Sequence, residues 1–246
     1  MKLLFSSDLH GRQDAYERYT AELKAGPYDL GILGGDLLDE WLPDELAVTL
    51  TQEAPDSLLD ELGGEDDDPV DVWKNSLAKT ALDRALLLRV GQLVSLLATA
   101  DKPVYFVLGN HDRTPWPESD LLKNLHGTQL RFQDRQFVGY RWTNMDREPN
   151  QLEADIAELR PLVDSDTILV THAPPRGILD GSREWGEGFG LPALRGFRPK
   201  PWLHLVGHVH SAAGRRGRYV NGAWPTVRQF FSIDVDRRRV QKVGRP

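Results

Sequence analysis

The chain contains no cysteine and no long hydrophobic run. Without cysteine there can be no disulfide bonds and no thiolate metal ligands, so any bound metal must be held by nitrogen and oxygen atoms. No stretch approaches the roughly 20 apolar residues of a membrane-spanning helix. The apolar run at residues 1–5 is too short for the core of a signal peptide. We therefore interpret it as a first strand and expect a cytoplasmic protein with no membrane span.

Positive charge is in deficit, with 30 Lys and Arg against 37 Asp and Glu and a net charge of −7. This balance argues against broad binding to a nucleic-acid backbone, so nucleic acid is not an expected partner. The charge is uneven: acidic residues concentrate between Glu53 and Asp71, and arginines from Arg215 onward. A length of 246 residues with 40% hydrophobic residues is enough for one domain, which we place over residues 1–246.

Short apolar runs alternate with helical patterns, which is typical of an α/β protein. The predicted strands are residues 2–5, 28–33, 104–108, 167–170 and 202–206, and the predicted helices are residues 12–24 and 152–163. Three later strands are expected to be antiparallel: residues 218–220, 229–235 and 239–243, with a turn at 236–238.

Residues 40–100 interrupt this order. An acidic segment at 53–71 predicts a solvated loop, and the apolar spacing over 72–98 predicts a long helix in which Gly91 is a candidate break. We interpret residues 40–100 as a helical insertion, or cap, within the single domain.

Polar motifs follow most of the predicted strands. They are Asp8-Leu9-His10, Gly35-Asp36, Gly109-Asn110-His111-Asp112, Thr171-His172 and Gly207-His208-Val209-His210. Each motif alone is a weak signal, because a solvent-facing strand end would explain it. Together they supply carboxylate, imidazole and amide groups, which predicts a two-metal hydrolytic centre. The two remaining histidines, His126 and His204, are interpreted as structural.

Two acidic residues of these segments have alternative interpretations. Asp39, three residues after Asp36, is either an ordinary acid at a helix N-terminus or the partner that orients a catalytic histidine. Asp112 either supports the site as an outer hydrogen-bond acceptor or caps the next turn.

The order of the motifs resembles that of the calcineurin-like metallophosphoesterases, which read D-x-H, G-D-x-x-D, G-N-H-D/E, a lone histidine and G-H-x-H. The match runs from the first strand to about Ser211, with the insertion outside the pattern. The resemblance implies a four-layer α/β/β/α sandwich that holds two divalent ions of Mn, Fe, Zn, Ni or Co above the strand ends. It implies these ligands: Asp8, His10, His210 and the bridging Asp36 on one ion, and Asp36, Asn110, His172 and His208 on the other.

The resemblance also implies a mechanism. Two ions acidify a bridging water, and the resulting hydroxide attacks phosphorus in line with the leaving oxygen. His111 would protonate the leaving group or stabilise the developing charge, and Asp39 would orient His111. The favoured substrate is a small phosphodiester of the nucleotide or cyclic nucleotide type. Candidate substrate contacts are Arg12, Arg176, Trp41, Trp116 and Trp185. The alternative is a solvent-facing position for the arginines and loop packing for the tryptophans.

Several other functions stay open. The phosphoprotein phosphatase branch has an arginine where this chain has Glu40, which argues against protein phosphatase activity. A phosphomonoesterase, a pyrophosphatase (including one for lipid-linked substrates), a nuclease and a non-catalytic scaffold are the alternatives. A scaffold should have lost ligands, whereas this chain retains all seven and His111. The metal, the substrate and the oligomeric state are not given by the sequence.

Overall fold

The computed structural model describes residues 1–39, 77–141, 149–181, 186 and 188–244. Its strands are β1 (Lys2–Ser6), β2 (Leu30–Gly34), β3 (Val104–Val107), β4 (Leu122–Asn124), β5 (Gln129–Phe132), β6 (Arg135–Tyr140), β7 (Thr167–Thr171), β8 (Leu203–Val206), β9 (Gly214–Arg216), β10 (Tyr219–Asn221), β11 (Phe230–Asp234) and β12 (Arg239–Val243). Its helices are α1 (Gln13–Ala25), α5 (Leu77–Ala98), α6 (Pro149–Leu159) and α8 (Trp224–Val227), with 3-10 turns η1 (Arg160–Leu162), η2 (Pro192–Gly196) and η3 (His210–Ala212).

The described strands form two mixed sheets of six strands each. The first has the order β12-β11-β1-β2-β3-β4, in which β1 to β4 are parallel and β11 and β12 are antiparallel. The second has the order β5-β6-β7-β8-β10-β9, with antiparallel strands at both edges. Because the central strands of each sheet are parallel, their carboxyl ends meet at one edge of that sheet.

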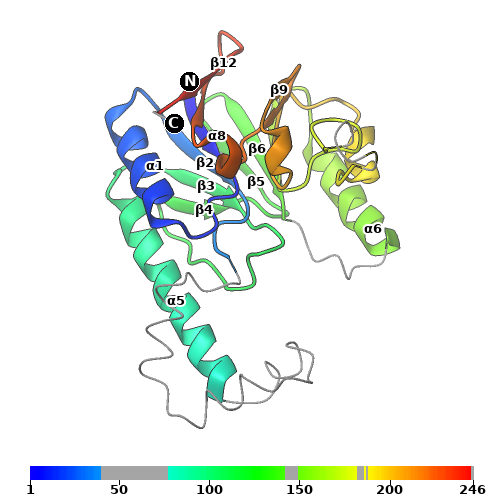
Figure 1. Ribbon diagram of the computed structural model, residues 1–246. Helices are drawn as coiled ribbons and strands as arrows, with labels where there is room; N and C mark the ends of the chain where they lie inside the picture. The colour runs from blue at the N-terminus through cyan, green and yellow to red at the C-terminus, as the bar shows by residue number, and fades with distance from the viewer. Residues whose placement is uncertain (40–76, 142–148, 182–185, 187, 245–246) are drawn as a thin grey trace.

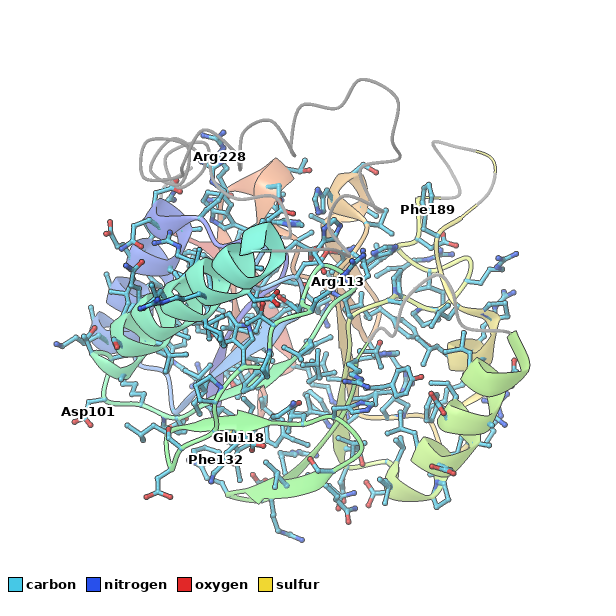
Figure 2. The ribbon with its side chains drawn as sticks, turned by 90° about the horizontal axis from the view of Figure 1, so that it is seen from below. Asp101, Arg113, Glu118, Phe132, Phe189 and Arg228 are labelled. Atoms are coloured by element: carbon cyan, nitrogen blue, oxygen red, sulfur yellow. The ribbon has the colours of Figure 1, made fainter. Side chains whose placement is uncertain are left out.

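Three hydrophobic cores separate four layers, which confirms the α/β/β/α sandwich. The first core lies between α1, α5 and the first sheet and includes Tyr16 and Phe106. The second lies between the two sheets and includes Phe5 and Phe137. The third lies between the second sheet and α6 and includes Ile156. Figure 2 shows α1 and α5 on one side of the sheets and α6 on the other.

Helix α5 is continuous through Gly91, so the candidate break there was wrong. Val90, Leu93 and Leu97 are buried in the first core, where α5 packs against α1 (Figure 1). The described part of the predicted insertion is therefore part of the main domain. Residues 40–76, which include the acidic loop, lie outside the described residues, and the cap stays a prediction.

The prediction missed four strands: β4, β5, β6 and β9. It was also incomplete for residues 218–220. The strand there, β10, is antiparallel to β9 but parallel to β8. Strands β11 and β12 are antiparallel as expected, with a turn at residues 235–238. Among the described helices, none combines the length and apolarity required to cross a bilayer.

Candidate metal centre

The carboxyl ends of five parallel strands bring the predicted ligands together. Asp8 follows β1, Asp36 follows β2 and Asn110 follows β3, all in the first sheet. His172 and His208 follow β7 and β8 in the second sheet. The centre therefore lies where both sheets end, and each sheet contributes ligands.

One half of the centre consists of Asp8, His10 and His210. The Nε2 atom of His210 lies 3.2 Å from Oδ1 of Asp8 and 3.2 Å from Nε2 of His10. Their candidate ligand atoms all lie within 4.8 Å of one another. Asp36 adjoins this group, with its Oδ2 atom 3.9 Å from Nε2 of His10.

The other half consists of Asp36, Asn110, His172 and His208. Oδ1 of Asn110 lies 3.0 Å from Nε2 of His172 and 3.0 Å from Nδ1 of His208. Oδ2 of Asp36 lies 3.3 Å from Nε2 of His172. Asp36 thus lies beside both halves, which is the position required of a bridging ligand.

Backbone groups orient these side chains. Nδ1 of His172 lies 2.9 Å from the carbonyl oxygen of Gly34, and an Nδ1–H donor there directs Nε2 toward the site. The Asp8 carboxylate accepts the backbone N–H of His208. The Asp36 carboxylate accepts the backbone N–H of His111 at 3.0 Å. These contacts hold the loop after β1 against the loop after β8, and the loop after β2 against the loops after β3 and β7.

The ionisable groups of the centre perturb one another. Burial opposes ionisation of Asp36, but the neighbouring His172 outweighs it and holds the pKa of Asp36 well below its usual range. Burial disfavours the charged form of His172, yet Asp36 raises the pKa of that imidazole to about 9. Burial, aided by His172, lowers the pKa of His208 to about 4, and burial also lowers the pKa of His10. The ring nitrogens of His10 and His208 are therefore available as lone-pair donors at neutral pH.

The donor set fits divalent transition-metal ions. Each half brings carboxylate, imidazole or amide atoms together, and in the first half the Nε2 atoms of His10 and His210 face one another at 3.2 Å, where a cation between them could accept both lone pairs. Asp8 and Asp36 are buried and supply the negative charge that a buried cation requires. The residues that would hold the two ions are the seven named above.

Four of the seven candidate ligand residues have left-handed backbones. Their φ angles are 58° at Asp8, 47° at His10, 49° at Asp36 and 67° at His208. Such angles are uncommon outside glycine and are concentrated at functional sites, where the surrounding fold enforces them. The carbonyl oxygens of Gly35 and Asp36 accept the backbone N–H groups of Asp8 and His10, which helps to hold these turns.

Glycines before the ligands permit close packing. A Cβ atom on Gly109 would collide with the carboxylate and backbone nitrogen of Asp36. A Cβ atom on Gly207 would collide with the side chains of Ser7 and Asp8. The glycine of each motif therefore lets one ligand loop lie directly on another.

Asp39 and His111 lie beside the first half of the centre. Oδ1 of Asp39 is 3.3 Å from Nδ1 of His111, and Oδ2 of Asp39 is 3.6 Å from Nδ1 of His10. The His111 side chain is 35% exposed, so a substrate can reach it. This arrangement favours the orienting role of Asp39 over a role as an isolated acid at a helix N-terminus.

Asp112 joins two ligand loops. Its carboxylate accepts backbone N–H groups from Leu37, Leu38 and Gly109 at 2.8–3.0 Å. Burial, reinforced by the nearby Asp36 carboxylate, raises the pKa of Asp112 to about 7. Of its two alternative roles, the contacts favour that of an outer acceptor that supports the site.

The predicted substrate contacts have different surroundings. Arg12 is half exposed, pairs with Asp14 and lies over the ring of Trp224. Arg176 is exposed, and its Nε donates to the carbonyl oxygen of Gly190. Trp41 and Trp185 lie outside the described residues.

Trp116 lies in the first core rather than at the surface. It is 7% exposed and packs against Tyr16 and Phe106. The packing alternative therefore applies to Trp116, and we no longer assign it as a substrate contact.

The sequence prediction missed Phe189. This ring is 54% exposed and lies 6.5 Å from the ring of His208, in an edge-on orientation. The Phe189 N–H donates to the carbonyl oxygen of Asp180, and Leu191 pairs with Pro175. Its loop is thus attached to the segment that follows His172, and Phe189 projects on the side of α6 (Figure 2). The sequence spacing between Phe189 and His208 does not predict this contact, because it depends on the backbone pairing of the Phe189 loop with the segment that follows His172.

His126 and His204 lie outside the ligand clusters. Nε2 of His204 lies 2.8 Å from the hydroxyl oxygen of Thr171, in the interior. Nδ1 of His126 accepts the backbone N–H of Arg141. Both contacts fit the structural roles expected of these histidines.

Comparisons with known proteins identify the family. The family model of the calcineurin-like phosphoesterases matches residues 1–212, so the chain belongs to that family. A crystal structure of TT1561 of Thermus thermophilus is similar, with a TM-score of 0.63, 14% identity, and coverage of 99% of this chain and 98% of that one. A second solved structure aligns with a TM-score of 0.70 and 13% identity over 98% of both chains. These two likenesses concern the fold alone. A search of curated proteins found no match.

Proposed function

We propose that the protein is a phosphodiesterase that uses two divalent metal ions to hydrolyse a small organic phosphate of the nucleotide or cyclic nucleotide type. The observation that carries this proposal is the pair of ligand clusters joined by the buried Asp36. When bound, the ions would lower the pKa of a water molecule and withdraw charge from the phosphate oxygens. A phosphomonoester or a pyrophosphate is the alternative substrate.

The chain's own residues would carry the remaining steps. His111 would donate a proton to the leaving oxygen from its exposed position beside the first cluster. The carboxylate of Asp39, 3.3 Å from Nδ1, would hold the proton on that nitrogen and so fix the ring orientation. The exposed ring of Phe189, beside His208, would pack on a planar organic group of the substrate.

Hydrolysis of bis-p-nitrophenyl phosphate after loading with Mn, Ni or Co tests the proposal. We expect metal-dependent turnover, and its absence with all of these ions would contradict the assignment. Parallel rates on p-nitrophenyl phosphate would separate diester from monoester preference.

Two variants test the division of roles. His111→Ala should retain bound metal but lose about 10²–10⁴-fold in turnover, because a general acid contributes about that much. Asp36→Asn should lose metal. His126→Ala is the matched control, since it removes a partly buried histidine outside the clusters. Full turnover in His111→Ala would overturn the proton-donor role.

A further inference from the structure

A pocket of about 710 Å³ lies beside the starts of β7, β8 and β10, and Gly177 and Ile178, from the segment that follows His172, also line it. Leu203, the first residue of β8, lines it, whereas the metal ligand His208 follows the other end of that strand. The rise along β8 is roughly 10 Å, at about 3.3 Å per residue. Strands β11 and β12 of the first sheet supply Ile233 and Val240 to the pocket. Strands β9 and β12 lie at the end of the molecule that carries the chain termini (Figure 1).

The pocket is strongly basic in an acidic protein. Its positive side chains are Arg195, Lys200, Arg215, Arg216, Arg218 and Arg238. None of the described aspartates or glutamates lines it, and within the described residues none of the six forms an ion pair. Like charges repel one another, so this arrangement is least costly when an anion neutralises it.

Backbone contacts hold the guanidinium groups in place. Arg216 donates to the carbonyl oxygen of Gly177 at 2.8 Å, and Arg215 donates to that of Gly217 at 3.0 Å. The guanidinium of Arg238 lies 5.1 Å from the centre of the Trp202 ring. Each guanidinium has five N–H donors, so these contacts leave donors for a ligand. The groups are partly ordered before binding, which lowers its entropic cost.

Charges around the pocket favour a compact anion over a long one. Trp202 also contacts Arg135, which pairs with the exposed Asp134 and Asp166. These carboxylates, and the net charge of −7, would repel a nucleic-acid strand that extends beyond the pocket. Phosphate oxygens suit the fork of arginine donors, and several phosphates are needed to match six positive groups.

We propose that this pocket binds a compact ligand with a chain of phosphate groups, at a site separate from the metal centre. Inorganic tripolyphosphate and a nucleoside triphosphate share this chemistry. Calorimetry with tripolyphosphate, ATP and adenosine distinguishes an inorganic oligophosphate from a nucleoside triphosphate as the ligand. A chelator keeps the metal centre empty, so the result does not depend on the proposed phosphodiesterase activity.

We expect tripolyphosphate and ATP to bind with a Kd below about 100 μM in about 0.15 M salt, and adenosine not to bind. If ATP bound more than about tenfold tighter than tripolyphosphate, the nucleoside would be part of the ligand. Arg215→Gln with Arg216→Gln should weaken binding about tenfold or more. Arg84→Gln with Arg131→Gln is the matched control, because it removes the same charge from exposed positions on α5 and β5.

Three results would overturn the proposal. Equal weakening in both double variants would indicate a general charge effect rather than a site. Absence of tripolyphosphate binding up to about 1 mM would exclude an oligophosphate ligand. Tight binding of a single-stranded oligonucleotide through Arg215 and Arg216, without tripolyphosphate binding, would indicate a nucleic-acid surface instead.

Discussion

Both carboxylate oxygens of Asp112 accept the backbone N–H of Leu37, at 2.9 and 3.0 Å, across 75 residues of sequence. The same carboxylate accepts the N–H groups of Leu38 and Gly109. It therefore sets the position of the loop that carries Asp36 relative to the loop that carries Asn110. Both of those candidate ligands belong to the same half of the candidate metal centre.

Asp112→Ala should lower both stability and metal affinity. Each buried N–H left without an acceptor costs about 1–3 kcal/mol, and loss of an outer support typically weakens metal binding about 10–100-fold. Urea unfolding and metal titration measure the two effects. Asp83→Ala, on the exposed face of α5, should change stability by less than about 0.5 kcal/mol. Unchanged metal affinity in Asp112→Ala would contradict the supporting role.

Gly109→Ala should abolish metal binding. A Cβ atom there would collide with the Asp36 carboxylate and backbone, so Asp36 could not keep its position beside both halves. Gly91→Ala is the matched control, because a Cβ atom on this helical glycine meets no atom within 4 Å. The control should gain about 0.5–1 kcal/mol from its better helix propensity. The metal bound to each purified variant is measured by atomic emission. Equal metal content in the two variants would contradict the prediction.

Phe189→Ala should affect a substrate that carries a nucleobase more than one that lacks it. The test pair is the p-nitrophenyl ester of a nucleotide and ethyl p-nitrophenyl phosphate, which release the same leaving group. Stacking of a base on an aromatic ring contributes about 1–3 kcal/mol. We therefore expect kcat/KM for the nucleotide ester to fall about tenfold, with the ethyl ester changed by less than about twofold. Leu88→Ala, which removes another exposed apolar side chain, should change neither. Equal losses on both substrates would show that Phe189 supports His208 instead.

His204 should make the folded state sensitive to acid. Burial lowers its pKa to about 3, whereas the pKa of histidine in the unfolded chain is about 6.5. Between these values the unfolded state binds more protons, so stability falls as the pH drops from about 6.5, by up to about 1.4 kcal/mol per unit. Unfolding at about pH 7 and about pH 5 should show a smaller loss in His204→Gln than in the wild type. His126→Gln should retain the wild-type slope, and identical slopes in all three proteins would refute the assignment.

The central strands and the convergence of the candidate ligands were predictable because each buried parallel strand is a short apolar run that ends in a polar motif. Strand β5 was missed because it alternates polar and apolar residues at an edge of its sheet, and β6 because its apolar run is only Phe137-Val138. Strands β4 and β9 have only three residues each. The left-handed backbones at Asp8 and His208 have no sequence signal, since neither residue is glycine.

Contacts created by long-range packing were also not predictable. The buried position of Trp116 depends on α1 and β3, which supply Tyr16 and Phe106. The basic pocket depends on η2, β9 and the turn before β12, three segments that only the tertiary fold brings together. The arginines after Arg215 were visible as a composition bias, but their convergence was not.

The candidate ligands come from both sheets, with Asp8, Asp36 and Asn110 on one and His172 and His208 on the other. An ion held by such a set is a cross-link between the two sheets, at the edge of the apolar layer that they share. It can form only after the last ligand strand, β8, has joined the second sheet. Occupancy of the centre would therefore require the ligand-bearing strands of both sheets to be in place, and loss of either sheet would release both ions together.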